Sequence, residues 1–278
     1  MENIYAVEGY TLHQCIGEGV YSLVFLAECN LTAERYAIKV VHKGKRRQRG
    51  TMHAEKEISA LLPLQGIPGV VKMHKHLEDD SAVYIVLSLH QGPTLSTRSL
   101  FQSTQSLLDA AYSILGTLEQ IHRHGVFHLD IKPANLILSA CMPPVLIDFG
   151  CSMLCPSGYI EESLLPFEGT PAYMAPEMVK RSSHGAKKLV SLEALDVWSF
   201  GCLLYFIACG KEAFSAPSLY SLYPKIVECD VDYAPLPREV ESICRQIFVS
   251  APARRSSLSF LLAHFSSLTS PGPRSPRS

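Results

Sequence analysis

The sequence of 278 residues lacks several features that would assign it to large classes of protein. Its formal net charge is only −1, so no excess of one sign indicates nucleic acid or a membrane surface as a partner. No uninterrupted apolar run reaches the roughly 18 residues of a transmembrane helix. The nine cysteines include no CxxC pair and no Cys/His cluster at zinc spacing. Without a signal peptide, we expect reduced thiols and a cytoplasmic location, with the nucleus as an alternative.

The composition indicates a folded protein with a substantial core. Hydrophobic residues make up 47% of the chain and charged residues 18%, which is ordinary for globular proteins. The length suffices for one large domain or two smaller lobes.

The most informative stretch, residues 126–138, places a polar turn between two short apolar segments. The pattern predicts a strand, a turn and a second strand, and a further strand ends at Asp148. Asp130 in the turn could accept a proton, and Lys132 offers a positive charge to a phosphate. Asn135 and Asp148 offer the oxygen ligands that Mg²⁺ prefers.

These motifs resemble the catalytic loop and the metal-binding triplet of protein kinases, here His128-Leu129-Asp130 with Asn135 and then Asp148-Phe149-Gly150. The resemblance implies ATP and Mg²⁺ as cofactors. It implies protein substrates and a monomer, with no nucleic acid or membrane partner. Three short motifs, in the catalytic loop and the triplet, are also similar to the Mos kinases.

The resemblance covers about residues 9–267 and implies an α+β, two-lobed fold. A small N-lobe of five β-strands and one main helix is expected over residues 9–89, with a hinge at about 88–92. A larger, mostly helical C-lobe is expected over residues 93–267. The lead-in at residues 1–8 and the Pro/Ser/Arg-rich tail at residues 268–278 lie outside, and we expect the tail to be disordered.

Two glycines, Gly17 and Gly19, follow a strand predicted from Gly9 and resemble the glycine-rich loop of the family, with Ser22 at the third glycine position. A glycine hairpin lets backbone N–H groups approach phosphates. By resemblance, Leu87 is the gatekeeper and residues 88–90 hold adenine. The implied ATP-binding residues are Ile16, Gly17, Glu18, Gly19, Val20, Val24, Ala37, Lys39, Leu87, Ser88, His90 and Ile137.

A single lysine, Lys39, stands in an apolar strand, where it is costly unless paired. In kinases this lysine holds the α- and β-phosphates and pairs with a glutamate of the next helix. That helix is predicted from Thr51 to about Leu64. Glu57 shares a face with the apolar residues at +3, +4 and +7, so we favour it as the partner, with Glu55 as the alternative.

Further strands are predicted at residues 70–73 and 82–89, and helices at residues 105–124, 238–249 and 256–266. An apolar helix is expected to open at Asp196 and to run to Cys209. Residues 43–49 form a basic run that could be a nuclear import signal, a binding patch for an acidic partner or a solvated loop. By resemblance, a spine of four side chains is anchored at Asp196; it consists of Leu61, Met73, His128 and Phe149.

Residues 151–168 resemble an activation segment, and the following GTPAYMAPE resembles the end of that segment in serine/threonine kinases. Thr170 is then implied to bond Asp130 and Lys132, and Glu177 to pair with Arg255. Leu129 stands where most regulated kinases have an arginine that binds a phosphate on the segment. The hydroxyls that could carry such a phosphate in this chain are those of Ser152, Ser157, Ser163 and Thr170.

We therefore expect a segment held by its own packing, an enzyme active without phosphorylation there, and apolar anchors at Leu165, Pro166 and Phe167. Alternatively, Lys180 or Arg181 replaces the missing arginine. Two other functions stay open, a pseudokinase scaffold and a small-molecule phosphotransferase.

Overall fold

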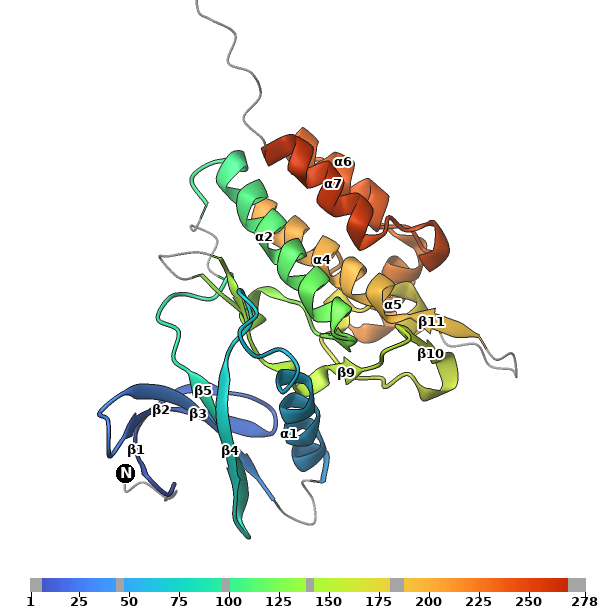
Figure 1. The fold of residues 1–278 in the computed structure, drawn as a ribbon. Coiled ribbons are helices and arrows are strands. Elements are labelled where there is room, and N and C mark those ends of the chain that lie inside the picture. Colours follow the sequence, from blue (N-terminus) through green and yellow to red (C-terminus); the bar gives the residue numbers. More distant parts are fainter. Residues whose placement is uncertain (1–6, 44–47, 97–100, 139–142, 181–187, 270–278) are drawn as a thin grey trace, which may run out of the picture.

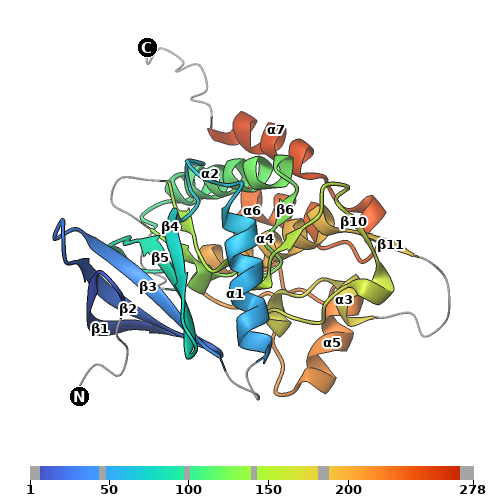
Figure 2. The same cartoon turned by 60° about the horizontal axis from the view of Figure 1, so that its bottom comes forward.

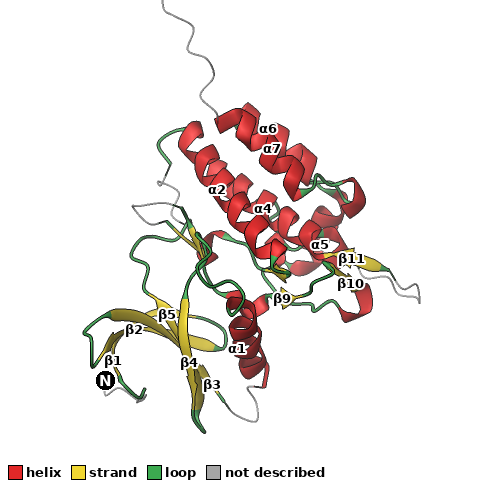
Figure 3. Cartoon of the chain, in the orientation of Figure 1, coloured by secondary structure: helices red, strands yellow, loops and turns green. Residues whose placement is uncertain are grey.

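The computed structural model describes residues 7–43, 48–96, 101–138, 143–180 and 188–269. Within these ranges the strands gather mainly in a small lobe and the helices mainly in a larger one (Figure 1). Colouring by secondary structure separates the two lobes clearly (Figure 3). The prediction of an α+β, two-lobed fold is confirmed.

The small lobe is built on an antiparallel sheet of five strands in the order β1-β2-β3-β5-β4. Along the central strand β3, alternate residues face opposite sides. Ile38 and Val40 pack in one apolar cluster, whereas Val41 belongs to the main core beside Ile85 and the helix α1. The strands are β1 (Tyr10–Glu18), β2 (Ser22–Cys29), β3 (Arg35–His42), β4 (Met73–Glu78) and β5 (Ala82–Ser88).

Helix α1 (Gln48–Leu61) lies between the sheet and the large lobe, as the central position of α1 in Figure 2 makes visible. The helix begins three residues before the predicted Thr51 and ends before the predicted Leu64. Its early end follows from Pro63, because a proline disfavours the helical conformation of the residue before it.

The predicted fourth strand at residues 70–73 was wrong, since β4 occupies Met73–Glu78. This strand lies at an edge of the sheet and exposes His74, Lys75 and His76, so it needs little apolar character. Val70 instead forms an isolated bridge to Leu146 of the large lobe.

The large lobe is organised around two long helices, α2 (Thr104–Arg123) and α4 (Leu192–Cys209). Helix α2 corresponds to the helix predicted at residues 105–124, and its apolar residues form a buried stripe. Helix α4 starts at Leu192, one turn before the predicted Asp196, because Ser191 caps it by accepting from the Ala194 N–H. By length and composition α4 could cross a membrane, but 78% of it is buried in the lobe, as a core helix is.

Short strands and smaller helices complete the large lobe. Helix α5 was not predicted, and α7 extends past the predicted domain end at residue 267 to Thr269. The tail at residues 270–278 and most of the basic run at residues 43–49 lie outside the described residues. The remaining elements are β6 (Val126–Phe127), β7 (Leu136–Ile137), β8 (Val145–Leu146), β9 (Met153–Leu154), β10 (Tyr159–Glu161), α3 (Pro176–Val179), β11 (Leu189–Ser191), α5 (Leu219–Glu228), α6 (Arg238–Ile247) and α7 (Leu258–Thr269).

Candidate active site

The turn between β6 and β7 holds Asp130 at the centre of a hydrogen-bond network. Lys132 Nζ lies 2.6 Å from Asp130 Oδ2 and donates to Thr170 Oγ1 at 2.8 Å. Thr170 donates to Asp130 Oδ1 through its hydroxyl at 2.8 Å and its backbone N–H at 2.9 Å. These bonds fix the orientation of the Asp130 carboxylate. They also bring together Asp130 and Thr170, which are 40 positions apart and were predicted from the sequence to interact.

Asn135 is buried beside this carboxylate. Its amide nitrogen donates to the Asp130 backbone carbonyl at 2.8 Å and to Asp130 Oδ2 at 3.2 Å. These bonds direct the Asn135 side chain, and its carbonyl oxygen Oδ1 is the atom left to coordinate a cation.

Lys39 lies between two carboxylates that come from distant parts of the chain. Its Nζ is 2.6 Å from Glu57 Oε2 and 2.6 Å from Asp148 Oδ1. The Glu57 side chain is 1% exposed, whereas Glu55 faces solvent. The structure thus pairs Lys39 with Glu57, the partner favoured from the helical face.

The charges of this cluster shift its pKa values. The Lys39 ammonium holds the pKa of Asp148 well below its usual range, although burial acts in the opposite direction. Burial alone would lower the pKa of Lys39, but the Glu57 and Asp148 carboxylates outweigh it and raise that pKa above its ordinary value. Lys39 therefore stays a cation, and Asp148 stays an anion, throughout the neutral range.

Asp196, fully buried in α4, fixes the backbone that leads into Asp130. Its Oδ2 accepts from the His128 N–H at 2.9 Å and its Oδ1 from the Leu129 N–H at 2.8 Å. Leu129 has φ +62°, a left-handed conformation that is costly for a leucine, so these bonds hold a strained turn. His122 Nε2 lies 2.8 Å from the same Oδ2, a contact that no sequence pattern indicates.

The four residues of the predicted spine are all buried. The rings of His128 and Phe149 meet edge to face with centroids 4.8 Å apart. Leu61, Met73 and Phe149 are all buried in the main apolar cluster.

The predicted nucleotide-binding residues of the sheet share one face. Gly17 pairs with Val24, Val24 with Lys39, and Ala37 with Leu87 across adjacent strands, and Ala37 precedes Lys39 by two positions. In the hairpin, the Gly19 N–H donates to the Ser22 carbonyl at 2.8 Å. Ile16 and Val20 of the same hairpin are exposed, Val20 to 90%, and Glu18 is exposed with them.

The predicted hinge leaves β5 at Ser88, whose backbone N–H donates to the Lys72 carbonyl. Gly92 adopts φ +157°, and a Cβ there would lie 2.2 Å from the Leu138 carbonyl oxygen, so only glycine fits this close approach. Ile137 is bridged to Thr94 just beyond it. The Nε2 atom of His90 is buried and accepts or donates no hydrogen bond among the described residues, which suits a segment that faces a ligand.

The activation segment is attached at several points. Of the three predicted apolar anchors, Leu165 is buried and Pro166 is partly buried. Phe167 is 49% exposed, and its ring lies perpendicular to that of Tyr223 with the centroids 6.2 Å apart. Arg255 forms a two-pronged ion pair with Glu177, at 2.8 and 3.0 Å, and the side chains of both are almost inaccessible.

Sequence reasoning missed an ion pair between α1 and the end of the segment. Lys56 Nζ lies 2.7 Å from Glu168 Oε2, and His53 Nδ1 lies 2.6 Å from the Gly150 carbonyl oxygen. His53 and Lys56 are three positions apart and share a helical face, which could have flagged them. No pattern in the sequence links either of them to Glu168, 112 residues from Lys56.

Comparison with known proteins agrees with this geometry. The family model described as "Protein kinase domain" matches residues 10–265. Serine/threonine-protein kinase PKH2 of Saccharomyces cerevisiae is 28% identical over 272 residues, covering 93% of this chain and 24% of the relative. CBL-interacting protein kinase 11 of Oryza sativa subsp. japonica is 29% identical over 256 residues, which cover 90% of this chain and 49% of the relative. Calcium-dependent protein kinase 33 of Arabidopsis thaliana is 28% identical over 267 residues (92% and 49%). The chain spans between about a quarter and about half of these relatives.

Proposed function

Because the chain belongs to the protein kinase domain family, we propose that it transfers the γ-phosphate of ATP to serine and threonine hydroxyls of protein substrates. The observation that carries this proposal is the joint geometry of Asp130, Lys132 and Thr170 on one side and Lys39 with Asp148 on the other. The relatives that are named serine/threonine kinases support the same acceptor class.

In this mechanism Asp130 orients the substrate hydroxyl and accepts its proton, since the bonds from Thr170 and Lys132 fix its carboxylate. Lys132 steadies the transferring phosphate by its charge. Lys39, held by Glu57, positions the α- and β-phosphates beneath the Gly17–Gly19 hairpin. The protein supplies mainly position and charge, which is what phosphoryl transfer requires.

The donor set fits Mg²⁺. Asn135 offers one carbonyl oxygen, and Asp148 offers a carboxylate that remains charged and whose side chain is 47% exposed. Two oxygen ligands from the protein, completed by water and phosphate oxygens, are typical of Mg²⁺ sites. Bound there, the ion would neutralise the charge of the phosphates during transfer.

Adenine binding is proposed for the hinge and the adjoining face of the sheet. Support comes from the shared face of Val24, Ala37 and Leu87 and from the buried Nε2 of His90, which no described residue bonds. The full set of twelve ATP-binding residues that the resemblance implies, of which Ile16 is the first and Ile137 the last, remains a proposal.

Two alternatives yield different assay results. A pseudokinase would transfer no phosphate, and a small-molecule phosphotransferase would prefer small alcohols over protein. Incubation with [γ-³²P]ATP and Mg²⁺, with casein or a panel of small alcohols as acceptors, separates the three. We expect label in casein and none above background in the alcohols.

Replacing Lys39 by Met should lower kcat at least about 100-fold, the usual cost of losing one charge that stabilises a transition state. Glu57→Gln should act in the same direction, because the neutral amide no longer holds the Lys39 ammonium by charge. Steady-state kinetics with varied ATP measures both effects.

Glu55→Gln is the matched control, since Glu55 lies two residues away on the exposed face of α1. It should leave kcat within about twofold, as surface substitutions far from a site usually do. Equal losses from the two glutamine variants would contradict the assignment of Glu57.

We also infer that the enzyme is active without phosphorylation of its activation segment. Leu129 is buried and carries no charge for a phosphate. The Ser152 hydroxyl is buried and donates to the Phe149 carbonyl at 2.6 Å, and Thr170 is bound to Asp130 and Lys132. Lys56 on α1 is bonded to Glu168 and so already gives the segment a fixed basic partner. Lys180 is exposed, and Arg181 lies outside the described residues.

This inference predicts the behaviour of phosphatase-treated protein. The chain is expressed in bacteria, dephosphorylated, and shown by mass spectrometry to carry no phosphate on residues 151–170. We expect kcat/KM to stay within about threefold of the untreated value, because no charge-assisted bond to phosphate is lost. A loss of 100-fold or more, recovered on rephosphorylation, would contradict it.

The remaining predictions concern the subfamily, the oligomeric state, the location and the partners of the protein. The likeness of the catalytic motifs to the Mos kinases, the monomeric state, the cytoplasmic location, and the absence of nucleic acid and membrane partners stay predictions from the sequence. Size-exclusion chromatography and imaging of a tagged protein would test the oligomeric state and the location.

A further inference from the structure

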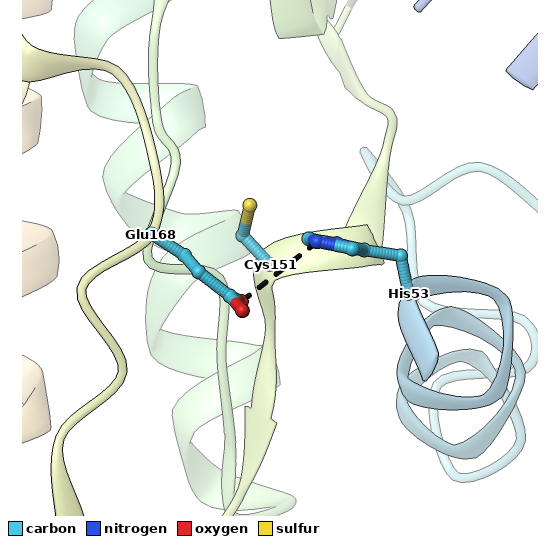
Figure 4. Close-up of side chains that lie close together, drawn as sticks. All are labelled: His53, Cys151 and Glu168. Carbon is cyan, nitrogen blue, oxygen red and sulfur yellow. Dashed lines mark ion pairs between the residues drawn. The ribbon is translucent and has the colours of Figure 1, made fainter. Parts of the chain in front are cut away.

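Three potential metal ligands converge outside the catalytic network, between α1 and the activation segment. They are His53, Cys151 and Glu168, and one ligand atom from each lies within 4.8 Å of the other two. Figure 4 shows the three side chains pointing toward one another from three separate stretches of chain. No sequence pattern indicates this cluster, because Cys151 follows His53 by 98 residues and Glu168 follows Cys151 by 17.

The surroundings of His53 select the nitrogen that would bind a metal. Its Nδ1 lies 2.6 Å from the Gly150 carbonyl oxygen, which can only accept, so Nδ1 carries the proton. Nε2 then presents its lone pair toward Glu168, whose Oε2 is 3.9 Å away. At zinc sites, a histidine ligand usually donates the N–H of its other ring nitrogen to a carboxylate, a backbone carbonyl or water. The ring of Tyr21, stacked at 5.1 Å, further fixes the imidazole.

The other two ligands are also oriented. Lys56 binds Glu168 Oε2 at 2.7 Å and holds the carboxylate near His53. Cys151 is partly buried, and burial together with the nearby carboxylates raises the pKa of its thiol to about 12. A metal bound to Cys151 Sγ would displace the proton of the thiol to solvent.

We propose that His53 Nε2, Cys151 Sγ and a Glu168 carboxylate oxygen form a binding site for Zn²⁺. Nitrogen and sulfur ligands favour zinc over the Mg²⁺ of the catalytic site. Three protein ligands leave a fourth position for water. At zinc bond lengths the ligand atoms stand about 3.5 Å apart, so a closure of about 1 Å completes the site.

The site would join three elements whose relative position matters for catalysis. His53 lies on α1, one turn from Glu57, which holds Lys39. Cys151 follows Asp148 by three residues, and Glu168 precedes Thr170 by two. Bound zinc is thus expected to stabilise the arrangement in which the catalytic residues already meet. The metal site goes beyond the proposed phosphotransfer, and its binding test does not depend on kinase activity.

The test uses the full chain with CoCl₂ as a spectroscopic substitute and ZnCl₂ as competitor. We expect one Co²⁺ per chain, with an intense near-ultraviolet band from thiolate coordination that ZnCl₂ abolishes. Zinc at a hundredfold excess over its Kd should raise Tm by about 5 °C.

Variants then locate the site. Cys151→Ser and His53→Gln should each weaken zinc binding at least about 100-fold. Removing a metal ligand should cost at least as much affinity as removing a residue that only orients a ligand. Cys155→Ser, in the same segment but outside the cluster, should bind as wild type does. The proposal is overturned if wild type shows no thiolate band, if the band survives in Cys151→Ser, or if Cys155→Ser abolishes it. The first of these tests uses only the wild-type protein. The proposal can therefore be refuted even if a variant fails to fold.

Discussion

Asp148→Asn should reduce kcat about 1,000-fold or more, with little change in thermal stability. The substitution removes the charge with which Asp148 would hold Mg²⁺, in a site where electrostatic stabilisation supplies most of the catalysis. Lys39 keeps its second partner Glu57 at 2.6 Å, so the lysine is not left unpaired. Single-turnover kinetics at saturating ATP and Mg²⁺, together with a melting curve, measures both quantities.

Asp130→Asn should lower kcat by about 100- to 10,000-fold, the range attributed to a lost general base. The amide is nearly the same size, but it cannot accept the substrate proton. Asp109→Asn is the matched control, because Asp109 is exposed on α2, far along the chain from the network. If both active-site variants kept kcat within tenfold of the control, the roles given to Asp130 and Asp148 would be wrong.

The second large effect concerns stability. Arg255→Met should lower the free energy of unfolding by about 3–5 kcal/mol, because it leaves the Glu177 carboxylate buried without its cation. The Arg255 side chain is fully inaccessible, donates to both Glu177 oxygens and to two backbone carbonyls, and stacks over Trp198 at 4.9 Å. Urea denaturation followed by tryptophan fluorescence is suited to the measurement, since Trp198 is the single tryptophan.

A double variant distinguishes the ion pair from simple packing. Arg255→Met with Glu177→Leu should recover part of the loss, because replacing both members of a buried pair by apolar groups is often close to neutral. Arg123→Met removes an exposed ion pair with Glu119 and should cost under about 1 kcal/mol. A loss of that same small size from Arg255→Met would show that the buried pair contributes no more than a surface one.

How far the sequence predicts the fold depends on how fully an element is buried. Helix α2 was predicted correctly because a long amphipathic helix must bury one complete apolar stripe, which is readily recognised in a sequence. Strand β4 was misplaced because an edge strand with polar residues lacks the alternation that marks a strand. Helix α5 was missed because Pro224 lies inside it, and proline normally indicates a helix end.

The candidate site was predictable where its residues occur in short motifs. Asp130, Asn135 and Asp148 follow from such motifs, and the helical face favoured Glu57 over Glu55. The contact of Lys56 with Glu168 joins residues 112 positions apart and depends on how the segment packs on α1, which no local pattern encodes. The same holds for the cluster of His53, Cys151 and Glu168.

The most direct test of the central claim is phosphoamino-acid analysis of casein labelled with [γ-³²P]ATP by wild type and by Asp148→Asn. Protein serine/threonine kinase activity predicts label in phosphoserine or phosphothreonine, at least about 100-fold above that given by Asp148→Asn. Wild-type labelling no higher than that of the variant, or label confined to phosphotyrosine, would contradict it.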